Sequence, residues 1–370
     1  MVNDVGFGVD GVDPKSIRYL RVAQRLPWPY DNVHGGQRYE PDAKATGLNW
    51  TPVRVLGEVP VEADGSASFY VPVDTAVYFQ LLDENHQELR RMRSFLSFQP
   101  GERRSCTGCH ETREITTPQG TTTLAGAREP SVPVPPPWGD RPLSFLRDVQ
   151  PVLDRHCAHC HSGLQPAGGV DLGGGLTEQH NRAYDTSVGK QLVAVANKLD
   201  DAKVTPPLAA FGSRKSRLIQ VLREGPHLDR VHLRNDDWLR LVTWVDANAP
   251  YHDGFLNKRL PASPYDLAAD TSLKQKLAAV HAQRCASCHD PAAVTRLDWI
   301  DLQQPRRSLF LQAPLAKKAG GSGKCDDVYK DETDADYQSL LRLVSAAVDR
   351  AWENPRRDLK AFTVTRTAVR

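Results

Sequence analysis

The chain of 370 residues is 40% hydrophobic, 25% charged and 7% aromatic, proportions that exclude a disordered or fibrous protein and favour two or three globular domains. Its 47 Lys and Arg against 45 Asp and Glu give a formal charge of +2 without a basic block, which argues against a nucleic-acid partner. No apolar run reaches the roughly 18 to 20 residues of a membrane-spanning helix, so we expect no membrane span.

The N-terminal region has the pattern of short antiparallel strands. Apolar and polar residues alternate in runs at 53–55, 68–71, 77–81 and 91–95. Residues typical of turns separate these runs, and Pro100 and Gly101 close the series. We therefore expect an antiparallel β-sandwich in a domain of residues 1–128. A proline-rich stretch follows, which we expect to be an extended linker at residues 129–141.

Helical spacing dominates the rest of the chain. Residues 144–155 have this spacing, with Pro151 at the start of a turn, and Asn235 begins an amphipathic helix. A capping box that starts at Ser272 predicts a third helix, and an apolar stripe from Tyr337 to Trp352 predicts a fourth. We expect an α+β multidomain protein in which two mainly α-helical domains follow the sandwich. Their expected bounds are residues 142–260 and 261–370.

Six of the seven cysteines form three copies of a Cys-x-x-Cys-His motif, whereas one chance copy is expected at about 10⁻³. This spacing is typical of covalent haem attachment, in which two thiols bond to the porphyrin and the adjacent imidazole ligates iron. We therefore predict three covalently attached haem c groups, with the three motif histidines as proximal iron ligands. The motif residues are Cys106, Cys109, His110, Cys157, Cys160, His161, Cys285, Cys288 and His289.

Two other readings of the cysteines fit the spacing less well. A zinc ribbon needs paired motifs about 15 to 20 residues apart, and these motifs begin 51 and 128 residues apart. A redox dithiol of the thioredoxin type is a single motif after a strand. Because covalent haem is attached outside the cytoplasm, we expect a periplasmic or extracellular protein whose signal peptide lies outside this numbering. The seventh cysteine, Cys325, has three possible roles: a reduced thiol, an intermolecular disulfide or a metal ligand.

The chain resembles a known family over nearly its whole length. Residues 56–66, 92–94 and 99–111 resemble the middle domain of the hydrazine synthase alpha subunit. Residues 145–153 resemble a planctomycete-type cytochrome c domain, and residues 244–251 and 313–325 resemble the C-terminal part of the same relatives. The resemblance implies a multihaem protein, without the β-propeller that often begins such relatives.

One departure from the family bears on activity. In the catalytic family member a Tyr four residues after the motif histidine ligates one haem and leaves that histidine for zinc. Here the residue four after His110 is Glu114, which argues against hydrazine synthesis itself.

A second ligand on each iron separates an electron carrier from a site that binds a small molecule. Nine of the 12 histidines lie outside the proximal positions, whereas only two methionines occur, so we expect mainly His/His ligation. We predict His227 as the distal ligand of the second haem and His34, as a weaker candidate, for the first. His180, His252 and His281 are open candidates for the third, and we expect Met92 to pack in a core.

The sequence thus favours an extracytoplasmic three-haem c-type cytochrome that carries electrons, with no catalytic residue assigned. One alternative is a haem enzyme of the hydrazine synthase alpha-like type, in which one open-coordination haem acts on a small nitrogenous molecule. Another is a subunit of a polymeric haem chain. The expected partners are redox proteins or other haem subunits, and a homo-oligomer or polymer fits the same pattern.

Overall fold

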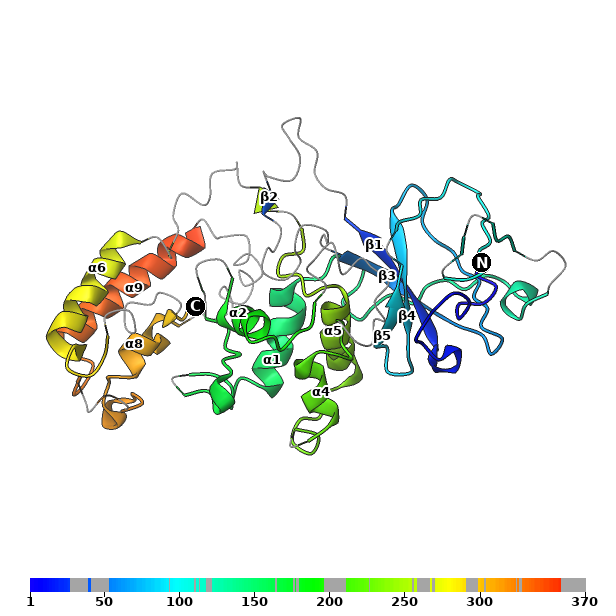
Figure 1. Cartoon of the computed structure of the whole chain (residues 1–370). Helices are drawn as coiled ribbons and strands as arrows, with labels where there is room; N and C mark the ends of the chain where they lie inside the picture. Colours follow the sequence, from blue (N-terminus) through cyan, green and yellow to red (C-terminus); the bar gives the residue numbers. More distant parts are fainter. Residues whose placement is uncertain are drawn as a thin grey trace. The chain divides into compact units, whose positions relative to one another are not determined.

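The computed structural model forms two compact units, Met1–Val152 with Ser187–Asn257 and Leu153–Thr186 with Lys258–Arg370. An antiparallel sheet and several helices make the fold mixed α+β, as the sequence predicts (Figure 1). The three-domain division expected from the sequence stays a prediction. The residues described are 1–26, 39–40, 53–92, 94–109, 111–112, 114–117, 122–163, 165–175, 177, 180–195, 211–225, 227–254, 256–257, 267, 270–290, 299–302, 304–323, 325 and 328–353.

The first unit is built on a four-stranded antiparallel sheet of order β3-β1-β4-β5 (Figure 1). Successive residues of β3 alternate between a buried face, which carries Val53, Val55 and Val59, and a more exposed face, as the period of two predicts. The central strand β1 pairs with both β3 and β4. The strands are β1 (Tyr19–Arg25), β3 (Val53–Pro60), β4 (Val77–Leu82) and β5 (Glu88–Arg91), with a separate antiparallel pair of β2 (Tyr39–Glu40) and β6 (Leu256–Asn257).

Two of the expected strands differ in the structure. The run at 68–71 makes only an isolated bridge, between Phe69 and Ser131, because its partner segment is rich in proline, which has no N–H to extend a ladder. The expected strand at 91–95 is replaced by β5, which ends at Arg91.

The proline-rich stretch lies along the edge strand β3. Val134 and Glu58 exchange backbone hydrogen bonds of 2.9 and 3.0 Å. Gly57 permits this approach, because a Cβ added there would lie 2.6 Å from the carbonyl oxygen of Val134, and its φ of +146° disfavours other residues. The stretch therefore covers an edge that would otherwise present unpaired backbone groups.

Helix α5 (Asn235–Asp246) begins where the sequence predicts, and its last residue binds the sheet. The buried carboxylate of Asp246 accepts hydrogen bonds from the backbone N–H of Ser213, at 2.7 Å, and of Glu88, at 3.0 Å. The backbone carbonyl of Asp246 accepts from Gln80 Nε2 at 2.9 Å and from Arg91 at 3.0 Å. This buried polar network joins a helix to two strands more than 150 residues earlier in the chain.

Burial, with the nearby carboxylate of Glu88, raises the pKa of Asp246 to about 7. A carboxyl whose pKa is raised by folding binds its proton more tightly in the folded state. The free energy of unfolding should therefore fall as the pH rises from about 4 to about 7, by at most about 4 kcal/mol. Urea unfolding at several pH values in this range measures how the free energy of unfolding changes with pH. In Asp246→Asn this change should be smaller. Equal slopes in the two proteins would contradict the assignment.

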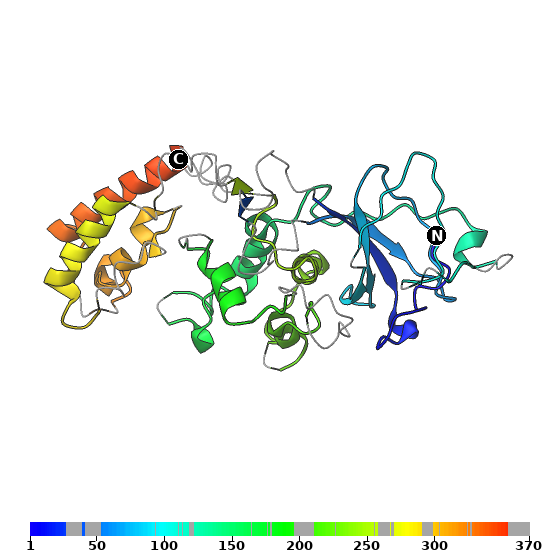
Figure 2. The same cartoon turned by 45° about the horizontal axis from the view of Figure 1, so that its top comes forward.

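The second unit has its core between α6 (Thr271–Val280) and α9 (Ala335–Glu353), which lie side by side in Figures 1 and 2. The apolar stripe predicted for the last helix is confirmed, since Tyr337, Leu340, Val344 and Val348 are all buried. Among the residues that the structure describes, the shorter α-helices are α1 (Gln150–His156), α2 (Arg182–Gly189), α4 (Arg217–Arg223) and α8 (Leu309–Gln312).

The cap of α6 differs from the prediction. The helix begins one residue before Ser272, and its N-cap is Asp270, whose carboxylate accepts from the backbone N–H of Leu273 at 2.8 Å. The capping box at Ser272 is therefore wrong, because the carboxylate two residues earlier already binds the amide at the start of the helix.

Replacing the capping residue tests this assignment. Asp270→Ala should lower the free energy of unfolding of the second unit by about 1 kcal/mol, because it leaves an amide of the first turn without its acceptor. The matched control Ser272→Ala alters an exposed residue of the same turn and should change it by less than about 0.5 kcal/mol. Thermal unfolding of both variants measures the two changes. A larger loss of stability in Ser272→Ala than in Asp270→Ala would show that Ser272 is the capping residue.

Candidate functional site

The second and third cysteine motifs fold into the same turn. In both, the N–H of the motif histidine donates to the carbonyl of the first cysteine at 2.9 Å. The N–H of the second cysteine donates to that same carbonyl, at 3.2 Å in the second motif and 3.0 Å in the third. The residues so bonded are Cys157, Cys160 and His161, and Cys285, Cys288 and His289.

The hydrogen bond that leads into this turn is also the same in the second and third motifs. The residue after the first cysteine donates its N–H to the carbonyl five residues earlier, from Ala158 to Leu153 at 2.8 Å and from Ala286 to His281 at 2.9 Å. Positions three and four residues apart lie on one side of a helical turn, so two sulfurs and one imidazole can face a single flat ligand. Both motifs therefore have the backbone geometry that covalent haem attachment needs.

The imidazole of His161 has a backbone partner. Its Nδ1 lies 3.3 Å from the carbonyl oxygen of Val170. When Nδ1 carries the proton and donates it there, the lone pair of the ring is on Nε2, which is the tautomer that ligates a metal. His161 thus fits the role of a proximal iron ligand, and the loop after the motif orients it.

Burial raises the pKa of several cysteine thiols of the motifs. Desolvation raises the pKa of Cys157 to about 11 and that of Cys109 to about 12, and it also raises the pKa of Cys106 and of Cys285. A redox dithiol reacts as the thiolate, and a raised pKa disfavours that form. Among the residues that the structure describes, no three His, Cys, Asp or Glu side chains gather as a metal-binding group.

The first motif has a different local structure. Cys106 lies in an extended segment, where its N–H donates to the carbonyl of Met1 at 3.0 Å and its carbonyl accepts from Asn3 at 2.9 Å. Cys109 is half-buried and packs with Cys106 against the apolar core beside the sheet. His110 lies outside the described residues, so its role as proximal ligand stays a prediction.

Gly108 is the position at which this segment tolerates no side chain. A Cβ there would lie 2.5 Å from the carbonyl oxygen of Phe7. Gly108→Ala should therefore lower the free energy of unfolding of the first unit by about 1 to 3 kcal/mol, the usual cost of overpacking. Gly189→Ala is the control, because no atom lies within 4 Å of its added Cβ. Urea unfolding compares the two, and equal effects would contradict the close contact.

The expected distal ligands stand as follows. His34 lies outside the described residues. His227 is half-buried and belongs to the first unit, whereas the second motif belongs to the second unit, so their pairing stays a prediction. Met92 packs against an apolar cluster, as expected.

The three open candidates for the third haem each have a contact. His180 Nδ1 lies 3.1 Å from the carboxylate of Asp185, and the ring of His252 packs edge-on to Tyr251. The third, His281, has its Nε2 2.6 Å from the carbonyl oxygen of His289. Cys325 is half-buried, and its proximity contributes to the raised pKa of Cys285.

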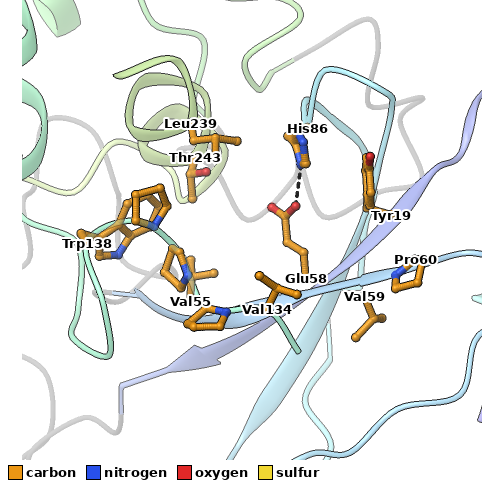
Figure 3. Close-up of a pocket in the computed structure, with 14 residues that line it drawn as sticks. Tyr19, Val55, Glu58, Val59, Pro60, His86, Val134, Trp138, Leu239 and Thr243 are labelled. Atoms are coloured by element: carbon orange, nitrogen blue, oxygen red, sulfur yellow. Dashed lines mark hydrogen bonds and ion pairs between the residues drawn. The ribbon is translucent and has the colours of Figure 1, made fainter. Parts of the chain in front are cut away.

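A cavity of about 240 Å³ in the first unit was not anticipated from the sequence (Figure 3). It lies between β3, the proline-rich stretch and α5, and its walls are mostly apolar. Glu58 Oε2 lies 2.6 Å from His86 Nδ1, Glu58 Oε1 accepts from Arg21 at 2.9 Å, and the rings of His86 and Tyr19 stack. Burial would raise the pKa of Glu58, but Arg21 and His86 outweigh it and hold this pKa below its ordinary value. The carboxylate therefore fixes an imidazole at the cavity wall.

Residues 15–111 match the family model described as the hydrazine synthase alpha subunit middle domain. The match begins just before β1 and ends one residue after His110 of the first motif. This part of the chain is therefore similar to that domain, as the resemblance in residues 56–66, 92–94 and 99–111 predicts.

Hydrazine synthase subunit alpha of Kuenenia stuttgartiensis is 22% identical over 315 residues, which cover 66% of this chain and 37% of that protein. A solved structure of Kuenenia stuttgartiensis hydrazine synthase is similar over 70% of this chain and 42% of that chain, with 20% identity and a TM-score of 0.47. The chain thus spans little more than a third of the length of the curated relative. In the part of the chain that is described, no helix is long and apolar enough to cross a membrane.

Proposed function

We propose that the chain is an extracytoplasmic c-type cytochrome that holds three covalently attached haems and transfers electrons. The observation that supports this most is the shared turn of the second and third motifs, which begin 128 residues apart. Two separated segments adopt the same hydrogen-bond pattern around the same residue types, which indicates the same ligand. The proposed cytochrome c-like domains are residues 142–260 and 261–370, after an N-terminal β-sandwich domain.

The roles of the side chains follow from the motifs. Each cysteine pair would hold one porphyrin covalently, and His110, His161 and His289 would be the iron ligands that the motifs supply. When bound, haem would supply one-electron redox chemistry. The protein sets the potential through the imidazole: a carbonyl that accepts from Nδ1, as that of Val170 can from His161, orients the ring and increases its basicity.

A second candidate function is a haem enzyme acting on a small nitrogenous molecule. The observation that favours it is the match of residues 15–111, which ends at the first motif, to the middle domain of the hydrazine synthase alpha subunit. In this account the first haem has an open coordination position. Glu114, in the place where the catalytic family member has Tyr, is exposed in this structure. The substrate would then differ from that of the relative, or Glu114 would act in place of the Tyr.

The partners we propose are redox proteins or further haem subunits outside the cytoplasm. The curated relative is itself named as a subunit, which supports an assembly for this chain. A polymer in which copies of the chain place haems in series is a third arrangement, and sedimentation that depends on protein concentration would support it.

Optical and electron paramagnetic resonance spectra of the oxidised and reduced holo-protein, with and without carbon monoxide, test the function. Electron transfer predicts three low-spin haems whose reduced spectrum carbon monoxide does not shift, because every iron has two protein ligands. A high-spin fraction near one third that carbon monoxide shifts would mean one open iron. That result would replace electron transfer with the enzyme.

A further inference from the structure

The carbonyl oxygen of the motif histidine has a donor in both helical motifs, but the donors differ. In the second motif, the His161 carbonyl accepts from the backbone N–H of Leu172 at 2.6 Å. In the third, the His289 carbonyl lies 2.6 Å from Nε2 of the His281 side chain. Two unrelated groups thus hold the same atom of the same turn.

His281 stands at the start of the shared turn. It is four residues before the first cysteine, where the second motif has Leu153, and both side chains are buried, 5% exposed for His281 and 0% for Leu153. Their backbone carbonyls accept the same hydrogen bond from the residue after the first cysteine. The two positions are therefore equivalent in structure, and the imidazole is an addition of the third motif.

We propose that His281 is a positioning residue for the third haem: its Nε2–H holds the carbonyl of His289 and so fixes the backbone from which the proximal imidazole projects. This inference rests on the proposed haem at the third motif. It also removes His281 from the candidates for the distal ligand of that haem. Nε2, which would have to bind iron, lies at hydrogen-bond distance from the His289 carbonyl, and His281 begins the turn that contains Cys285.

The orientation of a proximal imidazole affects the haem in a measurable way. A ligand that is held in one orientation gives one set of electron paramagnetic resonance lines and one reduction potential, whereas a loosely held ligand broadens the lines. In the second motif the loop that follows the histidine provides this restraint through Leu172 and Val170. In the third motif the restraint comes from the preceding helix, through His281.

The test compares three variants of the haem-loaded protein by potentiometric titration and electron paramagnetic resonance. His281→Leu installs the residue of the second motif and should shift one of the three redox transitions and broaden the lines of one low-spin haem. His281→Gln keeps an N–H donor and should restore the wild-type transition. Gln275→Ala, at an exposed position of α6, the helix just before His281, is the control and should leave all three redox transitions unchanged.

The outcomes separate this inference from the proposed function. Fewer than three haems in the wild-type protein would contradict the proposed function, and this result needs no variant. If three haems are present and His281→Leu leaves both the redox transitions and the electron paramagnetic resonance lines unchanged, His281 is not a positioning residue. Conversion of one haem from low to high spin in His281→Leu would also overturn it, because His281 would then be an axial ligand. If His281→Leu fails to fold, the test rests on His281→Gln, where a shifted transition would contradict the proposal.

Discussion

The carbonyl of the first cysteine in each helical motif accepts two backbone N–H groups, and the proposed chemistry depends on this arrangement. It brings the second cysteine and the histidine to the same side of the turn as the first cysteine, at Cys157 and again at Cys285. The preceding hydrogen bond, which spans five residues, sets where the turn leaves its helix. Because all these bonds are made by the backbone, two segments with different surrounding sequences reach one geometry.

The first motif depends on another constraint. Cys106 lies in an extended segment and both of its cysteines pack against the apolar core, so the pairing of Cys106 with the first residues of the chain takes the place of a helical turn. The match to the hydrazine synthase alpha middle domain ends at this motif. The chain therefore combines two kinds of motif surroundings, one shared by the second and third motifs and one associated with the sheet. That difference is why the enzyme candidate concerns the first motif.

Local patterns in the sequence predicted the features that depend on near neighbours. The stripe from Tyr337 to Val348 and the start of α5 at Asn235 follow from apolar spacing at the helical period, and both are confirmed. The cysteine spacing identified the motif positions in the same way. The capping residue of α6 was missed because Asp270 and Ser272 are both favourable caps, and only the backbone course of the chain decides between them.

These sequence patterns could not predict contacts between residues that are far apart in the chain. The cavity with Glu58 and His86 requires β3, a turn and the proline-rich stretch to meet, and no periodicity encodes that meeting. The same holds for Asp246, whose partners lie in β4, β5 and a loop. The sequence offers His281 only as a candidate distal ligand, and the proposal that it positions His289 rests on its contact with the His289 carbonyl, which no sequence pattern predicts.

The central claim is that each of the three motifs holds its own covalently bound haem. The most direct test is the intact mass of the purified holo-protein after denaturation, since thioether bonds persist when the fold is lost. The account predicts a single species with the mass of the chain plus three haems. A mass equal to that of the chain alone would contradict it. A zinc protein would give that mass, because denaturation releases the metal.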